Sequence, residues 1–225
     1  MKPNVGMQYP VAALVDTYTP GTGITYETPF VVSEARGATL TWETSDGEFY
    51  GDDVLLDSDV GITGYTLDFE SAGLKSGARA KLLGETVLAN SAGYRVTGKG
   101  SPDVGFGYVK VMREDVEGVV TYTYEAWFFY KMKYKLNSEE ARTKEKNIEW
   151  RVPTLNGKGA GIYLDDDDEP TFADHQDFDS LSEAKAWIMT QFGVTESAPA
   201  SGGSSTPASG DSTPAAGEGA QTGSP

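Results

Sequence analysis

The densest group of carboxylates in this sequence is the run Asp165-Asp166-Asp167-Asp168-Glu169. Carboxylates bind Ca²⁺, but a calcium loop spaces its ligands at alternate positions and turns on a glycine. Here the acids are consecutive, so their side chains diverge, and Pro170 follows where the chain would have to wrap. The run favours a solvated acidic loop, with weak cation binding as the alternative, and we predict no metal site.

The only histidine, His175, lies in the polar segment FADHQDFD. A nucleophilic triad would need an activated serine or a cysteine, and the sequence has no G-x-S-x-G motif and no cysteine. Zinc held by one histidine and no cysteine would need carboxylates almost alone, which is unusual. We therefore expect a histidine at the surface, no catalytic residues and no cofactor.

Glycan chemistry is the first alternative. Two of the 34 acidic residues that meet across a cleft would form the carboxylate pair of a glycosidase, and Trp42, Trp127 and Tyr130 are of the type that stacks on sugars. The same aromatic residues also suit a β core. A carbohydrate-binding or glycan-cleaving β-sandwich protein therefore stays an alternative hypothesis. Two Gly-Lys-Gly fragments, 98–100 and 157–159, are incomplete phosphate loops and predict turns.

Positive charge is concentrated in one part of an acidic chain. The protein has 18 basic and 34 acidic side chains and a net charge of -16, yet eight of the basic residues lie between Lys131 and Lys158. A chain this acidic repels nucleic acid, because phosphate binding depends on Lys and Arg. Such a patch instead suits the acidic surface of a second copy, and head-to-tail contacts build rings or filaments. DNA binding by the patch is a further alternative.

The patch begins in a strand-like segment from Val119 to Lys135. Strict alternation places Trp127, Phe129, Lys131 and Lys133 on one face, and Phe128, Tyr130, Met132 and Tyr134 on the other. This pattern predicts an edge strand, and a mixed-charge loop over 137–147 follows it. We interpret strand and loop as a surface for an acidic neighbour, and predict that changing Lys144 and Lys146 to Glu impairs assembly of a folded monomer.

The remaining pattern predicts a mainly β fold with two helices. Short alternating runs at 39–42, 65–69 and 108–111 are typical of strands. Apolar residues at helical spacing predict a helix over 74–84 that ends at Gly84, and the capping pattern at Ser180 and Glu183 predicts another that ends at Gly193. These helices are expected to cover the β core.

The two ends of the chain differ in composition from the middle. The segment from Val194 to Pro225 is almost entirely Ala, Ser, Gly, Thr and Pro, so it has nothing to bury and is expected to be disordered. We predict one β domain over 1–193 and a tail over 194–225. The N-terminus has no signal-peptide pattern and no apolar run has transmembrane length, so a soluble protein is expected.

The order of several short motifs resembles the major tail proteins, or tail tube proteins, of long non-contractile-tailed (siphovirus-like) bacteriophages. The resemblance covers about residues 4–193 and consists of a G-x-T-Y-x-T-P start, an F-Y-x-D-D hairpin, a helix that ends in L-L-G, and a strand with G-F-G. The matching residues are Gly23, Thr25, Tyr26, Thr28, Pro29, Phe49, Tyr50, Asp52, Asp53, Leu82, Leu83, Gly84, Gly105, Phe106 and Gly107. The tail over 194–225 replaces the immunoglobulin-like domain that relatives often carry.

The resemblance implies a β-sandwich or barrel of the tail-tube type, with an N-terminal arm over 1–22 and a long inter-subunit hairpin over 43–64. It implies a structural virion protein whose six copies form rings that stack into an acidic-lined conduit for phage DNA. It also implies the tape measure, tail tip and terminator proteins as partners, no membrane, and synthesis in the bacterial host cytoplasm. The candidate contact residues are Glu43, Asp46, Phe49, Tyr50, Asp52, Asp53, Lys131, Lys133, Arg142, Lys144 and Lys146.

Overall fold

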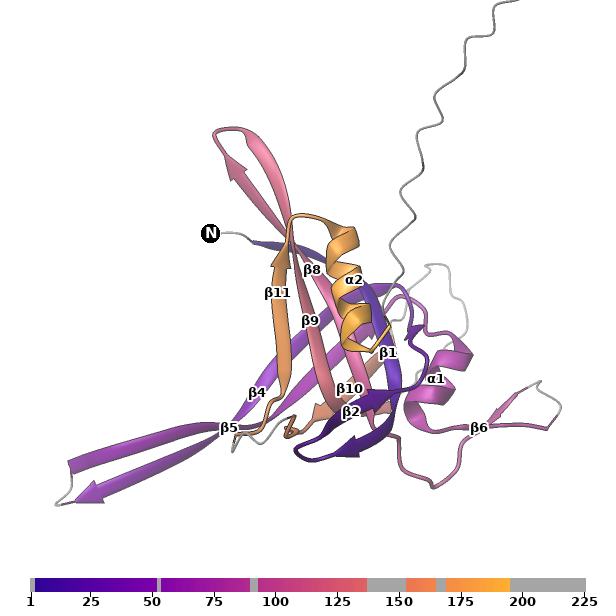
Figure 1. The fold of residues 1–225 in the computed structure, drawn as a ribbon, viewed down its shortest axis with the longest axis horizontal. Coiled ribbons are helices and arrows are strands. Elements are labelled where there is room, and N and C mark those ends of the chain that lie inside the picture. The colour runs from indigo at the N-terminus through magenta and orange to yellow at the C-terminus, as the bar shows by residue number, and fades with distance from the viewer. Residues whose placement is uncertain (1–2, 52–53, 90–92, 137–152, 165–168, 195–225) are drawn as a thin grey trace, which may run out of the picture.

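A computed structural model describes residues 3–51, 54–89, 93–136, 153–164 and 169–194 of the chain (Figure 1). Within these ranges the protein is mainly β, with eleven strands and two helices. The predicted mainly β fold with flanking helices is therefore confirmed. The tail predicted to be disordered, apart from Val194, lies outside the described residues.

The strands and helices have the following bounds. The strands are β1 (Asn4–Thr19), β2 (Gly23–Tyr26), β3 (Phe30–Val31), β4 (Ala35–Gly51), β5 (Val54–Ser71), β6 (Thr86–Val87), β7 (Tyr94–Arg95), β8 (Val104–Val116), β9 (Val119–Leu136), β10 (Thr154–Gly159) and β11 (Ala173–Phe178). The helices are α1 (Ser76–Leu83) and α2 (Leu181–Gln191). Each predicted helix is thus present.

The main sheet is antiparallel and has the strand order β2-β1-β8-β9-β10-β5-β4. Its strand β9 has two partners on one side, because its middle residues, 124–129, pair with β11 and its last residues, 132–136, pair with β10. From this division β10, β5 and β4 cross over the layer formed by β1, β8 and β9 (Figure 1). The two parts of the sheet face one another across a core, where the rings of Phe69 and Phe106 are 5.6 Å apart.

An extra residue in β9 decides which of its side chains face this core. Val104 pairs with Met132 and Phe106 pairs with Phe129, so two steps along β8 match three along β9. This is a β-bulge, which shifts the alternation by one residue. The predicted faces are therefore wrong beyond Tyr130. Trp127 and Phe129 share the core face with Met132 and Tyr134, not with the lysines.

Two buried tyrosines hold the bulge in place. The Tyr26 hydroxyl donates to the Tyr130 carbonyl at 2.8 Å, and the Tyr65 hydroxyl donates to the Lys131 carbonyl at 3.1 Å. Burial raises the pKa of both tyrosines well above its ordinary value, so both hydroxyls stay protonated and remain donors. The bulge that turns Lys131 outward is thus fixed from inside the molecule.

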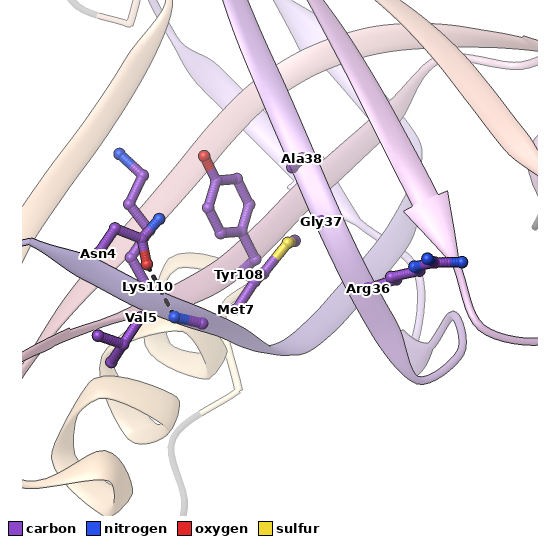
Figure 2. Close-up of a pocket in the computed structure, with 9 residues that line it drawn as sticks. Asn4, Val5, Met7, Arg36, Gly37, Ala38, Tyr108 and Lys110 are labelled. Carbon is purple, nitrogen blue, oxygen red and sulfur yellow. Dashed lines mark hydrogen bonds between the residues drawn. The ribbon is translucent and has the colours of Figure 1, made fainter.

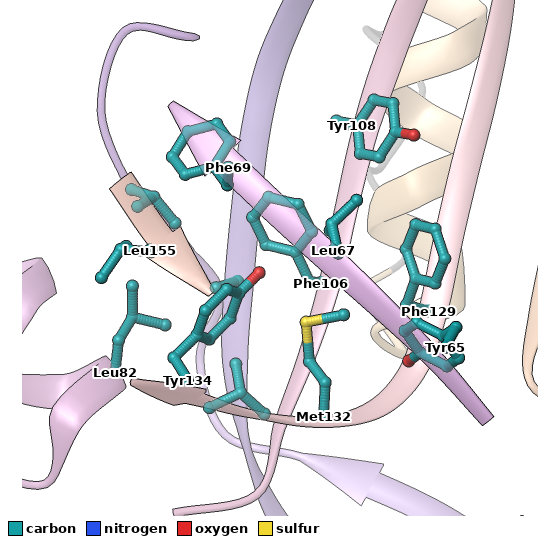
Figure 3. Packing of buried hydrophobic residues seen from close by; sticks show 13 residues of the cluster. Tyr65, Leu67, Phe69, Leu82, Phe106, Tyr108, Phe129, Met132, Tyr134 and Leu155 are labelled. Carbon is teal, nitrogen blue, oxygen red and sulfur yellow. The ribbon is translucent and has the colours of Figure 1, made fainter. Parts of the chain in front are cut away.

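The core between the two parts of the sheet is rich in aromatic rings from β5, β8 and β9 (Figure 3). Strand β10 enters it with two glycines. A Cβ at Gly157 would lie 2.9 Å from a carbon of the Tyr134 ring, and a Cβ at Gly159 only 1.9 Å from the Tyr65 ring. The prediction that 157–159 is a turn is therefore wrong: these glycines lie in a strand because two tyrosine rings fill the space beside them.

A second core lies on the other face of β8 and β9, under α2. Here the G-F-G motif has a packing role. A Cβ at Gly107 would lie 2.6 Å from Cγ2 of Ile188, and a Cβ at Gly105 would lie 2.5 Å from the Tyr26 ring. Both glycines allow α2 and Tyr26 to approach the sheet closely. The N-terminus of α2 is capped as predicted, since the Ser180 hydroxyl accepts from the Ser182 amide at 3.2 Å.

The N-terminal segment differs from its prediction as an arm. Asn4–Thr19 forms β1, which pairs with β8 on one side and with β2 and β3 on the other. Val11, Ala12 and Ala13 in its middle are at most 1% exposed. Small apolar side chains let this segment pass between the two cores, so it is an interior strand of the sheet.

Candidate assembly surfaces

The hairpin of β4 and β5 extends far beyond the rest of the molecule (Figure 1). Its two strands pair along their whole length. Ala35 lies opposite Ser71 at the core end, and Gly51 lies opposite Val54 near the tip. The predicted hairpin over 43–64 is thus present as the outer part of a longer one. We call its projecting part, 44–62, the arm.

The arm leaves the body at a second bulge. Glu43 pairs with Gly64 and Thr44 with Ile62, so Thr63 is the extra residue. The Glu43 carboxylate accepts from the Thr66 hydroxyl at 3.2 Å and lies 3.1 Å from the Lys158 ammonium. Among the predicted contact residues, Glu43 therefore sits at the base of the arm and is engaged within its own chain.

The described part of the arm carries exposed apolar side chains. Val60 is 64% exposed and Ile62 is 48% exposed, and they lie two residues apart on one face of β5. The predicted contact residues Asp46, Phe49 and Tyr50 lie in the arm on β4, where only the backbone is described. Asp52 and Asp53 lie outside the described residues.

Beyond the bulge, the lysines of β9 point away from the core, on the part of the sheet where β9 pairs with β10. Lys131 and Lys133 both reach Asp103, each at 3.7 Å, and the Lys131 ammonium lies 4.9 Å from the centre of the Tyr18 ring. The same chain thus supplies an acid for two of the cations that were predicted to contact a neighbour. Arg142, Lys144 and Lys146 lie outside the described residues, and their role stays a prediction.

The interpretation of this segment as an edge strand is wrong. β9 lies inside the sheet, with β8 on one side and with β10 and β11 on the other. The alternation of Lys131 and Lys133 with aromatic residues marks a strand with one solvent face, and that pattern is the same for an inner and an edge strand. A strand's pairing partners are set by segments distant in sequence, so alternation alone does not reveal them.

The outer face of β9, β10, β5 and β4 is polar. Lys135, Asn156, Asp68 and Thr39 form one row across these four strands, and the Asn156 amide donates to Asp68 at 2.6 Å. Lys133, Lys158, Thr66 and Thr41 form the next row. The helix α2 covers the opposite part of the molecule, against β8 and β9. The polar face therefore combines acids, lysines and threonines at close range.

The outer edge of β4 ends the main sheet. In the described part of the chain, no strand pairs with this edge. At Arg36, Gly37 and Ala38 it faces β1 across a cavity of about 180 Å³, into which Tyr108 and Lys110 also point (Figure 2). This volume is below the few hundred Å³ typical of ligand sites. The cavity is a seam between two strands, and the β4 edge is a place where a further strand can add.

No protein-family model matches this chain, and the search of curated proteins finds no match.

A second projecting element was not predicted from the sequence. Strands β8 and β9 form a hairpin whose tip, at Glu117 and Gly118, rises above the body on the side away from the arm (Figure 1). The available signal was the Glu-Gly pair between Val116 and Val119, which suits a two-residue turn between β-branched residues. It was overlooked because the two strands were assigned separately.

The remaining candidate sites give little support to other chemistry. His175 is exposed on β11, as expected, and stacks on Trp127 with ring centres 4.6 Å apart. The seam cavity has no acidic residue in its lining, and a larger cavity beside α1 has only Glu85, which Arg79 binds at 3.0 Å. Neither cavity therefore has the carboxylate pair that glycan cleavage needs.

The described ranges show no arrangement typical of a metal site and no helix that could span a membrane. No group of three or more His, Asp or Glu side chains there is arranged to hold a metal ion. Of the acidic run, 165–168 lies outside these ranges. Neither α1 nor α2 has the length and apolar character of a membrane-crossing helix.

Proposed function

We propose that this protein is a structural virion protein: the major tail tube subunit of a siphovirus-like phage, of β-sandwich or barrel type. Copies self-assemble into rings of six, and the rings stack into a conduit for phage DNA. The order of motifs from Gly23 to Gly107 supports this proposal, together with the arm that leaves the β body. The protein has no catalytic role in this account.

The arm is the observation that carries the proposal. A two-stranded hairpin without a packed face is at best marginally stable in water. Here it continues past Glu43 and Gly64 with Val60 and Ile62 exposed on one face. Burial of apolar side chains against a second protein would stabilise such an element, at about 25 cal/mol for each Å² removed from water. A neighbouring copy of the same chain is the simplest such protein.

The β4 edge supplies a second contact in this account. An unpaired strand edge presents backbone donors and acceptors that a strand of another chain can satisfy. When β4 of each copy adds to the sheet of the next, the polar outer face of β9, β10, β5 and β4 becomes continuous around the ring. A closed ring removes the free edges that would otherwise cause aggregation.

The charges on the polar face suit a channel for DNA. Each lysine that binds a phosphate releases counterions, and this release drives tight binding. Lys131 and Lys133 share Asp103, and Lys158 lies beside Glu43, so each of these cations already has an acid of its own chain within 4 Å. A wall of this kind gives sliding DNA little to bind. In this proposal DNA passes through the lumen without specific binding. The protein does not act at a membrane.

The same proposal supplies partners and location. The tube would be made in the host bacterial cytoplasm and become part of the virion. The tape measure protein would lie inside it, and the tail tip and terminator proteins would bind its two ends.

Removing the arm tests the proposal directly. In the test variant a two-residue Asn-Gly turn replaces 44–63 and joins Glu43 to Gly64, a pair that already lies opposite in the hairpin. The full-length protein is expected to form rings and tubes in sedimentation and electron microscopy, whereas the variant should stay folded and monomeric. Full-length protein that is monomeric at every concentration would overturn the proposed function. Normal tubes from the variant would exclude the arm as the contact.

A further inference from the structure

The tip of the β8–β9 hairpin is an exposed apolar surface. Val116 is 55% exposed, Val119 is 64% exposed, Val120 is 40% exposed and Tyr122 is 50% exposed. The strand β1 pairs with β8 only as far as Met112, and β11 pairs with β9 only from Tyr124. No described strand therefore covers either edge of the tip. Val116 and Val119 pair across the hairpin and share one face, while Val120 and Tyr122 lie on the other, so both faces of the tip carry exposed apolar side chains. Clustered exposure of this kind marks an interaction site.

The tip is also a tight turn with negative charge. Glu117 has φ 54° and Gly118 has φ 83°, the pair of positive φ values that defines a tight type I′ turn. The Gly118 amide donates to the Asp115 carboxylate at 3.2 Å, which ties the turn to the strand before it. From 113 to 118 the acids Glu114, Asp115 and Glu117 outnumber the single base, Arg113. The tip is thus a preformed apolar wedge with negative charge.

A cavity of complementary character lies beside α1. It has a volume of about 460 Å³ and lies between α1, the loop before β8, and the small β6–β7 hairpin. Leu14, Ala80 and Pro102 give it an apolar lining, and the exposed side chains of Val87 and Tyr94 extend that lining to the surface. The volume is in the range of sites that enclose a ligand or a few side chains.

The charge of this cavity is positive. Lys81 and Lys99 both line it, and its one acid, Glu85, is engaged with Arg79 at 3.0 Å. The Lys81 ammonium lies 4.6 Å from the centre of the Phe30 ring. Lys99 is exposed and forms no ion pair with any residue that the structure describes. The cavity therefore presents an apolar interior with an unpaired cation, which matches the acidic wedge.

We infer that the β8–β9 tip of one copy docks into the α1 cavity of a second copy. The tip and the cavity lie at opposite ends of the molecule, so a tip cannot reach the cavity of its own chain (Figure 1). Val116 and Val119 enter the apolar cavity, and Glu117 meets Lys99. The contact is head-to-tail, so it repeats from copy to copy. The inference rests on the proposed self-assembly and identifies a contact separate from the arm and the β4 edge.

The tip suits a repeated contact. A tight turn loses little conformational freedom on binding, so most of the gain from burying the valines is kept. One tip in one cavity is a small interface, which alone gives weak association. In an assembly of many copies the contacts act together, and their combined strength rises without any new contact.

Cross-linking tests the contact, because the chain contains no cysteine. Full-length Lys99→Cys and Glu117→Cys are mixed and treated with a short thiol-to-thiol cross-linker. The control mixture pairs Lys99→Cys with Thr39→Cys, which places the second thiol on the exposed polar face of β4. Cross-linked dimer is expected in the first mixture and not in the control. The isosteric change Val116→Thr with Val119→Thr, added to the Glu117→Cys chain, should abolish that dimer.

The outcomes separate this contact from the proposed function. Tubes without a cross-link between residues 99 and 117 of two copies would overturn the contact and leave the tail-tube function standing. Dimer without rings or tubes would support the contact and count against the function. Equal yields in the test and control mixtures would show random collision and also overturn the contact. Circular dichroism of each variant confirms that it is folded before cross-linking.

Discussion

The ring of Tyr65 fills the space beside Gly159. A Cβ added to Gly159 would lie 1.9 Å from Cζ of Tyr65, a distance that no packing adjustment short of moving the ring accommodates. The hydroxyl of the same ring donates to the Lys131 carbonyl at the β9 bulge. One buried tyrosine therefore requires a glycine at position 159 of β10. The same tyrosine holds the bulge that turns the β9 lysines toward the polar face.

Gly159→Ala is expected to destabilise the protein by about 1–3 kcal/mol or more, because the added methyl group overpacks the core. Denaturant unfolding followed by circular dichroism measures the change. Gly37→Ala is the matched control, since a Cβ there meets no atom within 4 Å. It should be neutral or slightly stabilising. Equal losses at both positions would contradict the role assigned to Tyr65.

The paired variant makes this assignment specific. Tyr65→Ala alone removes a buried ring and should cost about 3–5 kcal/mol, as for other large aromatic truncations. Adding Gly159→Ala to it should cost much less than Gly159→Ala does alone, because the clash is gone. Strict additivity of the two changes would show that the two residues do not interact.

Tyrosine ionisation should separate exposed from buried rings. Burial raises the pKa of Tyr26, Tyr65, Tyr108, Tyr130 and Tyr134 above its ordinary value. Their folded pKa values exceed the unfolded value of about 10, so the stability they contribute is complete below that pH and is lost as pH rises above it. Ultraviolet absorbance at rising pH follows the ionisation of these rings. The five buried rings should ionise only with alkaline unfolding, and their ionisation in the folded protein near pH 10 would contradict this packing.

The acid beside the β9 lysines should control nucleic-acid retention. Asp103→Asn leaves Lys131 and Lys133 without their shared acid, and weak retention on immobilised DNA at low salt is expected, falling steeply as salt rises. The free energy of unfolding, measured by thermal unfolding, should change by less than about 1 kcal/mol, because the Lys133 side chain is 60% exposed. Asp115→Asn changes the net charge equally but lies at the β8–β9 tip, and it should not be retained. Strong retention of the unchanged protein would contradict the idea of a non-binding channel wall.

Local patterns in the sequence predicted the helices and the β class, because capping residues, helical spacing and β-branched runs act over a few residues. Ser180 and Gly84 mark a helix start and a helix end as expected. Long-range pairing was not predictable in the same way. The bulge at Tyr130 depends on hydroxyls from Tyr26 and Tyr65, which are far away in sequence. Strict alternation therefore assigned the wrong face to Lys131.

The candidate site was predicted unevenly for the same reason. The arm was found because its Asp- and Gly-rich composition contrasts with the core, and Glu43 lies at its base. The charge pairing of Lys131 with Asp103, and of Lys158 with Glu43, was missed because each pair joins segments that are far apart in the sequence. The N-terminal strand was mistaken for an arm because its short apolar run gives no sign of its two neighbours in the sheet.

The central claim is that this chain assembles with itself. Electron microscopy of the purified full-length protein at increasing concentration, with sedimentation velocity on the same samples, tests it most directly. The account predicts closed rings with an open centre that stack into tubes as the concentration rises. A folded protein that stays monomeric at every concentration, with no rings or tubes, would contradict it.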